Sequence, residues 1–174
     1  MQSQSYNMIP RSEITRSNWT ATSFSAWSEQ YEASNAIDGT VGNPWDVYSS
    51  QLGNYEWLQI IFGTTIHDIA GVKLLKRSGH NGLGNARFHD IQARIGQVEW
   101  LVTKGRVPIT ENHMCDSFGP ADVEELTVWF RCRMLLSGRY LTLQRVTEGY
   151  LEADEINVYT KINKLITEWV EFLE

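Results

Sequence analysis

Apolar and polar residues alternate along most of the chain with the two-residue period of a β-strand. In residues 90–96, for example, Ile91, Ala93 and Ile95 fall on one face, and the polar Gln92 and Arg94 fall on the other. The predicted strands are 56–62, 71–77, 90–96, 126–132, 139–145 and 154–159. Turn-forming clusters lie between them, and short strands at about ten-residue spacing are typical of an all-β sandwich or barrel.

The last fifteen residues follow a different period. In 160–174 the apolar residues recur every three or four positions, which predicts one amphipathic helix. Its apolar stripe is Ile162, Leu165, Ile166, Trp169, Val170 and Leu173. A helix of this length is marginal in water, so the stripe must pack against something. We expect 162–173 to dock on another chain, either a second copy or a different protein; packing on its own domain is the competing explanation.

Composition limits the partners. The chain has 174 residues, enough for one sizeable core, and its net charge is −6, with no basic run. Nucleic acid and anionic membranes need a basic surface, so neither is expected as the main partner. No apolar stretch approaches the roughly 18 residues of a membrane helix. The first residues lack the features of a signal peptide, which leaves a cytosolic chain or a secreted one whose signal has been removed.

Two cysteines, Cys115 and Cys132, lie 17 positions apart. They form either one disulfide, which requires an oxidising compartment, or two buried free thiols. Asn18-Trp19-Thr20 has the pattern of a glycosylation site and favours the same compartment, although the pattern is common by chance. On balance we expect a secreted or extracellular protein, with the cytosol left open.

The segment 34–45, SNAIDGTVGNPW, is rich in turn-forming residues. Asp38-Gly39 favours a tight reversal, so a plain turn explains it. A Ca²⁺ ion also needs a tight bend that supplies six to eight oxygen ligands, and this segment contains carboxylate, amide and hydroxyl oxygens. The local sequence leaves both interpretations open.

No enzymatic motif appears. The chain has no nucleophile elbow and no phosphate-binding loop, and its histidines lack metal-ligand spacing. Asp154 and Glu155 are adjacent acids, but neighbours in a strand point to opposite faces and cannot flank one bond. We therefore expect a protein that is not an enzyme.

The order of these features resembles the F-type lectins, or fucolectins, within the discoidin-like superfamily. The resemblance spans about Ser17 to Tyr159 and rests on SNAIDG, WLQIIFG, IAGVKLLKR, FHDIQARIG, VWFRCRMLLSGRYLTLQR and LEADEINVY. It implies an eight-stranded jelly-roll β-sandwich over 17–159, after an N-terminal extension (1–16) and before the helical segment (160–174). It also implies a disulfide between Cys115 and Cys132.

The family binds one Ca²⁺ where its first and last strands meet. Carried over, the resemblance implies a structural Ca²⁺ held by side-chain or backbone oxygens of Asn35, Asp38, Thr40, Ser49, Asp154 and Glu155. Asp38 and Glu155 would supply the carboxylates. A cation there would explain why an acidic pair begins an otherwise apolar strand, since a buried unpaired carboxylate is costly.

The fucose-binding residues of the family are only partly matched. Arg77 and Arg87 correspond to its two arginines, but the segment between them lacks the expected Asp and cysteine pair. The family's upstream His falls near Leu52. His80 either replaces that His or is a solvated loop residue. The implied sugar site is thus Arg77, His80 and Arg87, with Trp45, Tyr48 or Tyr55 as the stacking surface.

Two functions follow from the resemblance. One is a calcium-containing carbohydrate-binding module with an altered sugar loop, whose ligand is a glycan, possibly fucosylated. The other is a non-catalytic adhesion module that kept the fold and the calcium site, lost fucose binding, and takes protein or lipid through the same loops. The apolar stripe of 162–173 favours the second function slightly.

Overall fold

The computed structural model describes residues 11–77, 89–119 and 127–161. Its strands are β1 (Arg11–Glu13), β2 (Thr20–Ser23), β3 (Tyr48–Ser49), β4 (Trp57–Leu75), β5 (Ile91–Gly96), β6 (His113–Phe118), β7 (Thr127–Arg145), β8 (Glu152–Ala153) and β9 (Glu155–Lys161). Short 3₁₀ helices occupy the loops: η1 (Glu29–Tyr31), η2 (Ala33–Ile37) and η3 (Val102–Lys104). The all-β prediction is confirmed. In the described ranges, no helix has the length and apolar character needed to cross a membrane.

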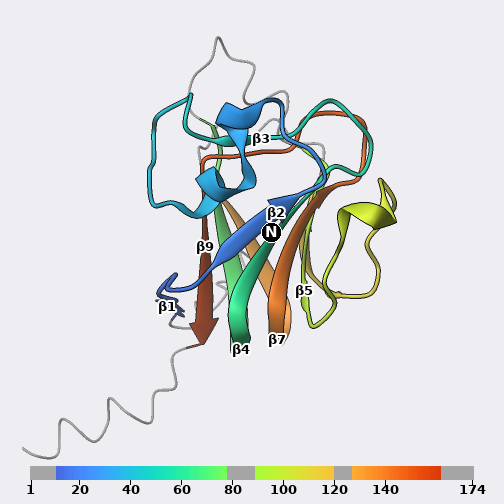
Figure 1. Cartoon of the computed structure of the whole chain (residues 1–174). Coiled ribbons are helices and arrows are strands. Elements are labelled where there is room, and N and C mark those ends of the chain that lie inside the picture. The colour runs from blue at the N-terminus through green and yellow to red at the C-terminus, as the bar shows by residue number, and fades with distance from the viewer. Residues whose placement is uncertain (1–10, 78–88, 120–126, 162–174) are drawn as a thin grey trace, which may run out of the picture.

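Two long strands join the layers of the sandwich. β4 and β7 have 19 residues each, where the sequence pattern predicted two shorter strands in each case. The first half of β4 pairs with β2 and the second half of β7; the second half of β4 pairs with β9 and the first half of β7. Register shifts between Ile61 and Gly71 separate these halves, so both strands bend from one layer into the other (Figure 1).

One apolar core lies between the layers. Of the inward residues predicted from the alternation, Leu126 lies outside the described residues and Cys132 is partly buried. The others are each at most 4% exposed: Val72, Leu74, Ile91, Ala93, Ile95, Val128, Phe130, Leu141, Leu143, Ile156 and Val158. They come from β4, β5, β7 and β9 and belong to a single cluster. A two-residue period is therefore enough to identify the buried face of each strand.

The domain extends further at both ends than the resemblance implied. Residues assigned to an N-terminal extension form β1, which pairs antiparallel with β9 and sets Glu13 opposite Tyr159. The last strand continues past Tyr159 to Lys161, so the first two residues assigned to the C-terminal helix are strand. The rest of that predicted helix, including 162–173, lies outside the described residues.

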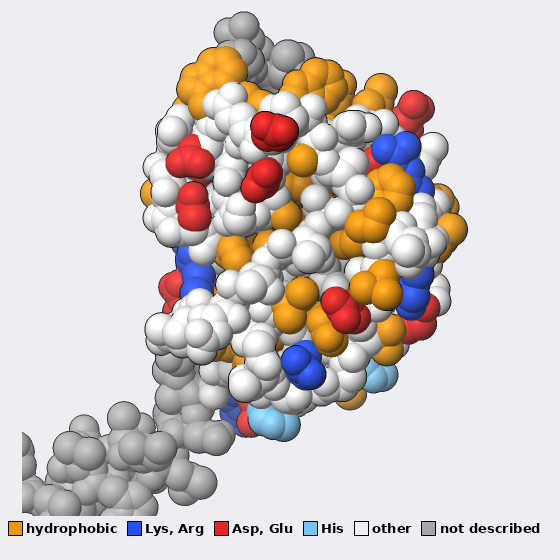
Figure 2. Space-filling view, in the orientation of Figure 1, with side chains coloured by type: hydrophobic (Ala, Val, Ile, Leu, Met, Phe, Trp, Pro, Cys, Tyr) orange, Lys and Arg blue, Asp and Glu red, His pale blue; other side chains and the backbone are white. Residues whose placement is uncertain are grey.

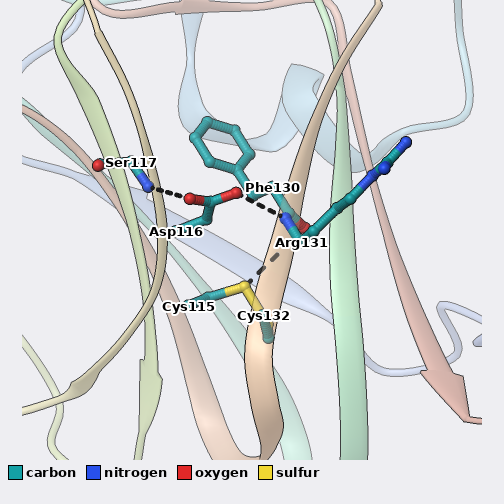
Figure 3. Close-up of a disulfide and its surroundings, with 6 residues drawn as sticks. All are labelled: Cys115, Asp116, Ser117, Phe130, Arg131 and Cys132. Carbon is teal, nitrogen blue, oxygen red and sulfur yellow. Dashed lines mark hydrogen bonds between the residues drawn. A yellow bond between two sulfur atoms is a disulfide. The ribbon is translucent and has the colours of Figure 1, made fainter. Parts of the chain in front are cut away.

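A disulfide connects β6 to β7. Cys115 and Cys132 are bonded, with their Cα atoms 4.1 Å apart, which confirms the implied pairing (Figure 3). The neighbouring Asp116 strengthens the same junction, because its carboxylate accepts the backbone N–H of Arg131 at 2.9 Å and that of Ser117 at 2.8 Å. The bond therefore holds an edge strand of one layer against the first half of β7.

Removing this disulfide should destabilise the domain. A cross-link that closes a loop of this size lowers the conformational entropy of the unfolded chain. In the chain-entropy model this adds about 3 kcal/mol to the unfolding free energy. The double variant Cys115→Ala/Cys132→Ala should therefore lose about that much unfolding free energy in urea titrations. Equal stability of the variant and the oxidised protein, or two reactive thiols in the unreduced, denatured protein, would contradict the assignment.

Candidate functional site

The candidate binding residues lie in the loops at one end of the sandwich. Leu75 at the end of β4 pairs with Glu155 at the start of β9, and Ile91 at the start of β5 pairs with Arg145 at the end of β7. The segment that contains η1, η2 and β3 lies at this same end (Figure 1). We call this end the rim.

A tight turn follows η2. Gly39 has a φ of 87° and Gly42 one of 81°, values that favour glycine, so the predicted reversal at Asp38-Gly39 is confirmed. The backbone N–H of Thr40 donates to the Asp38 carboxylate at 2.7 Å, as in an Asx-turn. The turn therefore exposes its remaining N–H groups to neighbouring acids.

Asp154 and Glu155 both reach this turn. Gly42 donates its N–H to Asp154 at 3.0 Å, and Gly39 donates to Glu155 at 2.8 Å. We expected strand neighbours to point to opposite faces, but Asp154 lies at a bend between β8 and β9 and is not in a ladder. The two carboxylates converge on one loop for that reason.

The two carboxylates are buried and differ in their partners. Glu155 is 2% exposed, and burial raises its pKa to about 7, although the Arg16 guanidinium pairs with its Oε1 and lowers the pKa in part. Burial also raises the pKa of Asp154, and the charges of Asp38 and Asp46 raise it further. The Oδ1 atom of Asp154 is buried without a hydrogen-bond partner. A cation bound beside Asp154 and Glu155 would offset the free-energy cost of burying both carboxylates.

Two of the other implied calcium ligands, Asn35 and Ser49, use their side chains elsewhere. The Asn35 amide donates to the carbonyl of Gln30 at 2.8 Å, and the Ser49 hydroxyl contacts Glu152 at 3.2 Å. Across the described ranges, no group of three or more His, Cys, Asp or Glu side chains is arranged to hold a metal ion. A Ca²⁺ ion at this turn would therefore need backbone carbonyls beside the carboxylates.

Of the three implied polar sugar ligands, Arg77 alone is described, and it is engaged within the protein. Its guanidinium lies 3.3 Å from Glu152 and stacks over Tyr31 and Trp45, at 5.3 and 5.9 Å from the ring centroids. His80 and Arg87 lie outside the described residues. Tyr48, one of the proposed stacking rings, is fully buried and cannot contact a ligand.

The structure shows a polar cluster that sequence reasoning missed. His89 and Asp90 are in contact at 2.8 Å, and the Thr147 hydroxyl donates to the same carboxylate at 3.0 Å. Arg145 lies 2.7 Å from the other ring nitrogen of His89 and also donates to the Tyr150 carbonyl at 2.9 Å. The hydrogen bond from His89, above all, lowers the pKa of Asp90. Asp90 is thus a partly exposed, ionised acceptor.

Aromatic and apolar side chains lie beside this cluster. Trp27 is 57% exposed and its ring meets Tyr150 edge-on at 5.7 Å. Leu52, where the resemblance expects a His, is 51% exposed, and the next residue, Gly53, exchanges two backbone hydrogen bonds with Gly149. We define the rim cluster as Trp27, Leu52, His89, Asp90 and Tyr150. Figure 2 shows apolar side chains at the surface of this end of the molecule, and others further down the same face.

A buried ion pair supports the loop that carries Leu52. Glu56 is fully buried, accepts the Ser25 hydroxyl at 2.6 Å and pairs with Arg106 at 2.6 Å. Ser25 in turn accepts the backbone N–H of Gln51 at 3.0 Å. These contacts fix the loop of residues 50–56 against the buried Glu56, and they leave the Leu52 side chain exposed to solvent.

Solved structures with a similar fold include lectins and carbohydrate-binding modules. The chain is similar to a fucolectin from the serum of the striped bass, Morone saxatilis, with 25% identity and a TM-score of 0.63 over 83% of this chain and 46% of that one. It is also similar to the family 32 carbohydrate-binding module of Clostridium perfringens NanJ, solved with galactose: 14% identity, TM-score 0.63, over 86% and 99% of the two chains. The lectin domain of lectinolysin, solved with the Lewis b antigen, matches at 17% identity and a TM-score of 0.64, over 83% and 94%.

The chain spans less than half of the striped bass lectin and nearly all of the other two domains. No family model matches the sequence, and a search of curated proteins finds no match. The resemblance to F-type lectins and other discoidin-like domains is therefore confirmed through the structure.

The raised pKa of Glu155 predicts a pH dependence in the presence of chelator. Between its ordinary pKa of 4.5 and about 7, Glu155 holds a proton when folded and loses it on unfolding. The unfolded state then binds fewer protons, so the unfolding free energy should decrease as pH rises through this window. Glu155→Gln should flatten that decrease in denaturant titrations, whereas Glu148→Gln, an exposed control, should not. An unchanged slope in Glu155→Gln would contradict the assignment.

Proposed function

We propose that this chain is a carbohydrate-binding module that holds a terminal sugar at the rim cluster and performs no catalysis. The observation that carries the proposal is that an exposed aromatic ring, Trp27, and an ionised acceptor, Asp90, lie at the same end of this fold. The similar solved structures described above are lectins or carbohydrate-binding modules, which supports this class of ligand.

Trp27 and Asp90 would contact the sugar, and Tyr150 and Arg145 would hold the site in place. An indole ring packs against the apolar C–H face of a sugar, and Tyr150 holds the Trp27 ring edge-on. An ionised carboxylate accepts hydroxyl hydrogens strongly, which suits Asp90. Arg145 is a positioning residue because it fixes His89 and the 148–150 turn from below. The site therefore orients a neutral sugar without reacting with it.

The residues that recognise the sugar should differ from those of fucose-binding relatives. Arg77 corresponds to one of their arginines, yet it is bound to Glu152 and covered by two rings. Leu52 stands where the resemblance expects a His and offers an apolar contact instead. We therefore propose a terminal neutral sugar of the galactose or fucose class, recognised mainly through Asp90 and Trp27.

We also propose one structural Ca²⁺ at the turn of residues 38–42. The support is the buried, unpartnered Oδ1 of Asp154 beside the buried carboxylate of Glu155 and the charge of Asp38. Asp154 and Glu155 would supply carboxylate oxygens, with backbone oxygens from Asn35, Asp38, Thr40 and Ser49 completing the shell. Bound there, the ion would neutralise the acids and connect the turn to the start of β9. The disulfide and this ion both fit an extracellular setting.

Sugar binding should depend on the two central residues. A glycan array identifies the best ligand, and calorimetry then measures its affinity for Trp27→Ala and Asp90→Asn. Loss of a charge-assisted hydrogen bond costs about 1.5–3 kcal/mol, so Asp90→Asn should weaken binding tenfold or more. Asn is a suitable replacement because residue 90 has a φ of 54°, which Asn tolerates.

The matched control is Trp45→Ala, which removes another half-exposed indole, 49% exposed, that stacks on Arg77. It should bind the sugar within about twofold of wild type. No binding across the array by the calcium-loaded protein, with protein or lipid binding instead, would favour the alternative of an adhesion module.

Calcium should stabilise the protein, and Arg16 should modulate the effect. An ion at 100 times its Kd adds about 2.7 kcal/mol of unfolding free energy by mass action. Arg16→Gln removes the positive charge paired with Glu155, so this variant should melt lower in chelator and bind Ca²⁺ more tightly by calorimetry. Arg139→Gln is the control for charge. Identical melts in chelator and in excess Ca²⁺ would refute the calcium proposal.

A further inference from the structure

The sheet formed by β9, the second half of β4 and the first half of β7 has an outward face that the rim site does not use. The even-numbered residues of these strands, such as Val72, Phe130 and Val158, are buried in the core, so the odd-numbered ones face outward. We call this surface the basic face; it consists of Lys73, Trp129, Arg131, Arg133, Tyr159 and Lys161.

The cations of this face are not neutralised in the described part of the chain. There, the side chains of Lys73, Arg131, Arg133 and Lys161 form no ion pair or hydrogen bond. The acid at the edge, Glu13, is instead bonded to Asn157 and Tyr159 and lies 3.6 Å from Arg16. Four positive charges thus gather on one face of a chain whose net charge is −6.

An aromatic pair lies among these charges. The rings of Trp129 and Tyr159 are 4.9 Å apart and inclined at 49°, and Trp129 is 37% exposed. The register explains the contact: Gly71 pairs with Tyr159 on one side and with Arg131 on the other, and it has no side chain to separate the rings from the arginines. Aromatic and guanidinium groups therefore form one continuous surface.

We propose that the basic face is a second carbohydrate site, for glycans that carry sulfate or carboxylate groups. Arg131 and Arg133 lie on the same side of β7, about 6.6 Å apart along the strand. A guanidinium binds an anionic oxygen pair with two parallel hydrogen bonds. The ring of Trp129 offers the apolar face of a sugar a packing surface between such contacts. This inference goes beyond the proposed rim site and does not depend on it.

The charge distribution favours a glycan over a nucleic acid. Nucleic-acid binding rests on many phosphate contacts and a basic domain, whereas this chain is acidic outside a patch of four cations. The disulfide also fits an extracellular setting, where sulfated and uronic glycans occur. Binding here requires no Ca²⁺, because the carboxylates of the 38–42 turn take no part in it.

The test uses the full chain with heparin fragments as the sulfated probe, measured by calorimetry in chelator. The double variant Arg131→Gln/Arg133→Gln should bind at least tenfold more weakly than wild type, and Trp129→Ala should also bind more weakly. The control Lys104→Gln/Arg139→Gln removes two exposed charges elsewhere and should stay within twofold; Arg139 lies on β7 but over Tyr140, in the other layer. Thermal melts confirm that each variant is folded.

Three results would overturn the proposal. An equal loss in the control would indicate nonspecific attraction to charge. Unchanged heparin affinity in Arg131→Gln/Arg133→Gln, with a loss of self-association in sedimentation, would assign the face to a second copy of the chain. Tighter binding to an oligonucleotide of equal charge than to heparin would assign it to nucleic acid. If the rim cluster binds no neutral sugar, the heparin experiment remains a valid test of the basic face, because the two sites are tested with different ligands.

Discussion

A carboxylate buried at the start of the last strand needs a positive partner, and much of the rim depends on how that need is met. Glu155 is 2% exposed and lies where β9 begins, and its two oxygens contact Arg16 and the N–H of Gly39. These contacts join segments separated by more than 100 residues. The same turn takes up Asp154, so the strand start, the turn and the N-terminal segment are fixed together.

The two bent strands, β4 and β7, bring the loops of the rim together at one end of the domain. Because β4 and β7 run through both layers, their termini return to the rim, where Leu75 meets Glu155 and Arg145 meets Ile91. Arg145 then holds the 148–150 turn and His89, and Tyr150 supports Trp27. The rim cluster is thus assembled from four loops whose bases are rigid sheet positions, which suits preorganised recognition of a sugar.

The sequence predicted what depends on neighbouring residues. Alternation identified the buried face of each strand, and Asp38-Gly39 identified the turn, because period and positive φ are local properties. The disulfide came from the family resemblance. Neither source predicted that β4 and β7 would each be continuous, since the bends of these strands depend on pairing with β2 and β9.

The parts of the site that were missed depend on long-range contacts. Arg16 lies 139 residues from Glu155, and no local signal connects them. The bend at Asp154, which brings two acids together, follows from the change of partner between β8 and β9. Tyr48 looked like a stacking ring but is buried, and Arg77 looked like a sugar ligand but is bound to Glu152. Composition gave no means of separating exposed aromatic residues from buried ones.

A heteronuclear NMR titration of the calcium-loaded protein with the best neutral sugar tests the rim site most directly. The chain has seven tryptophans, so the indole N–H signals report which ring contacts the ligand. The account predicts saturable shifts of the Trp27 indole and of the backbone amides of Asp90 and Thr147, with the Trp100 and Trp129 indoles unchanged. Saturable shifts confined to other residues, or sugar binding that leaves the Trp27 indole unmoved, would contradict it.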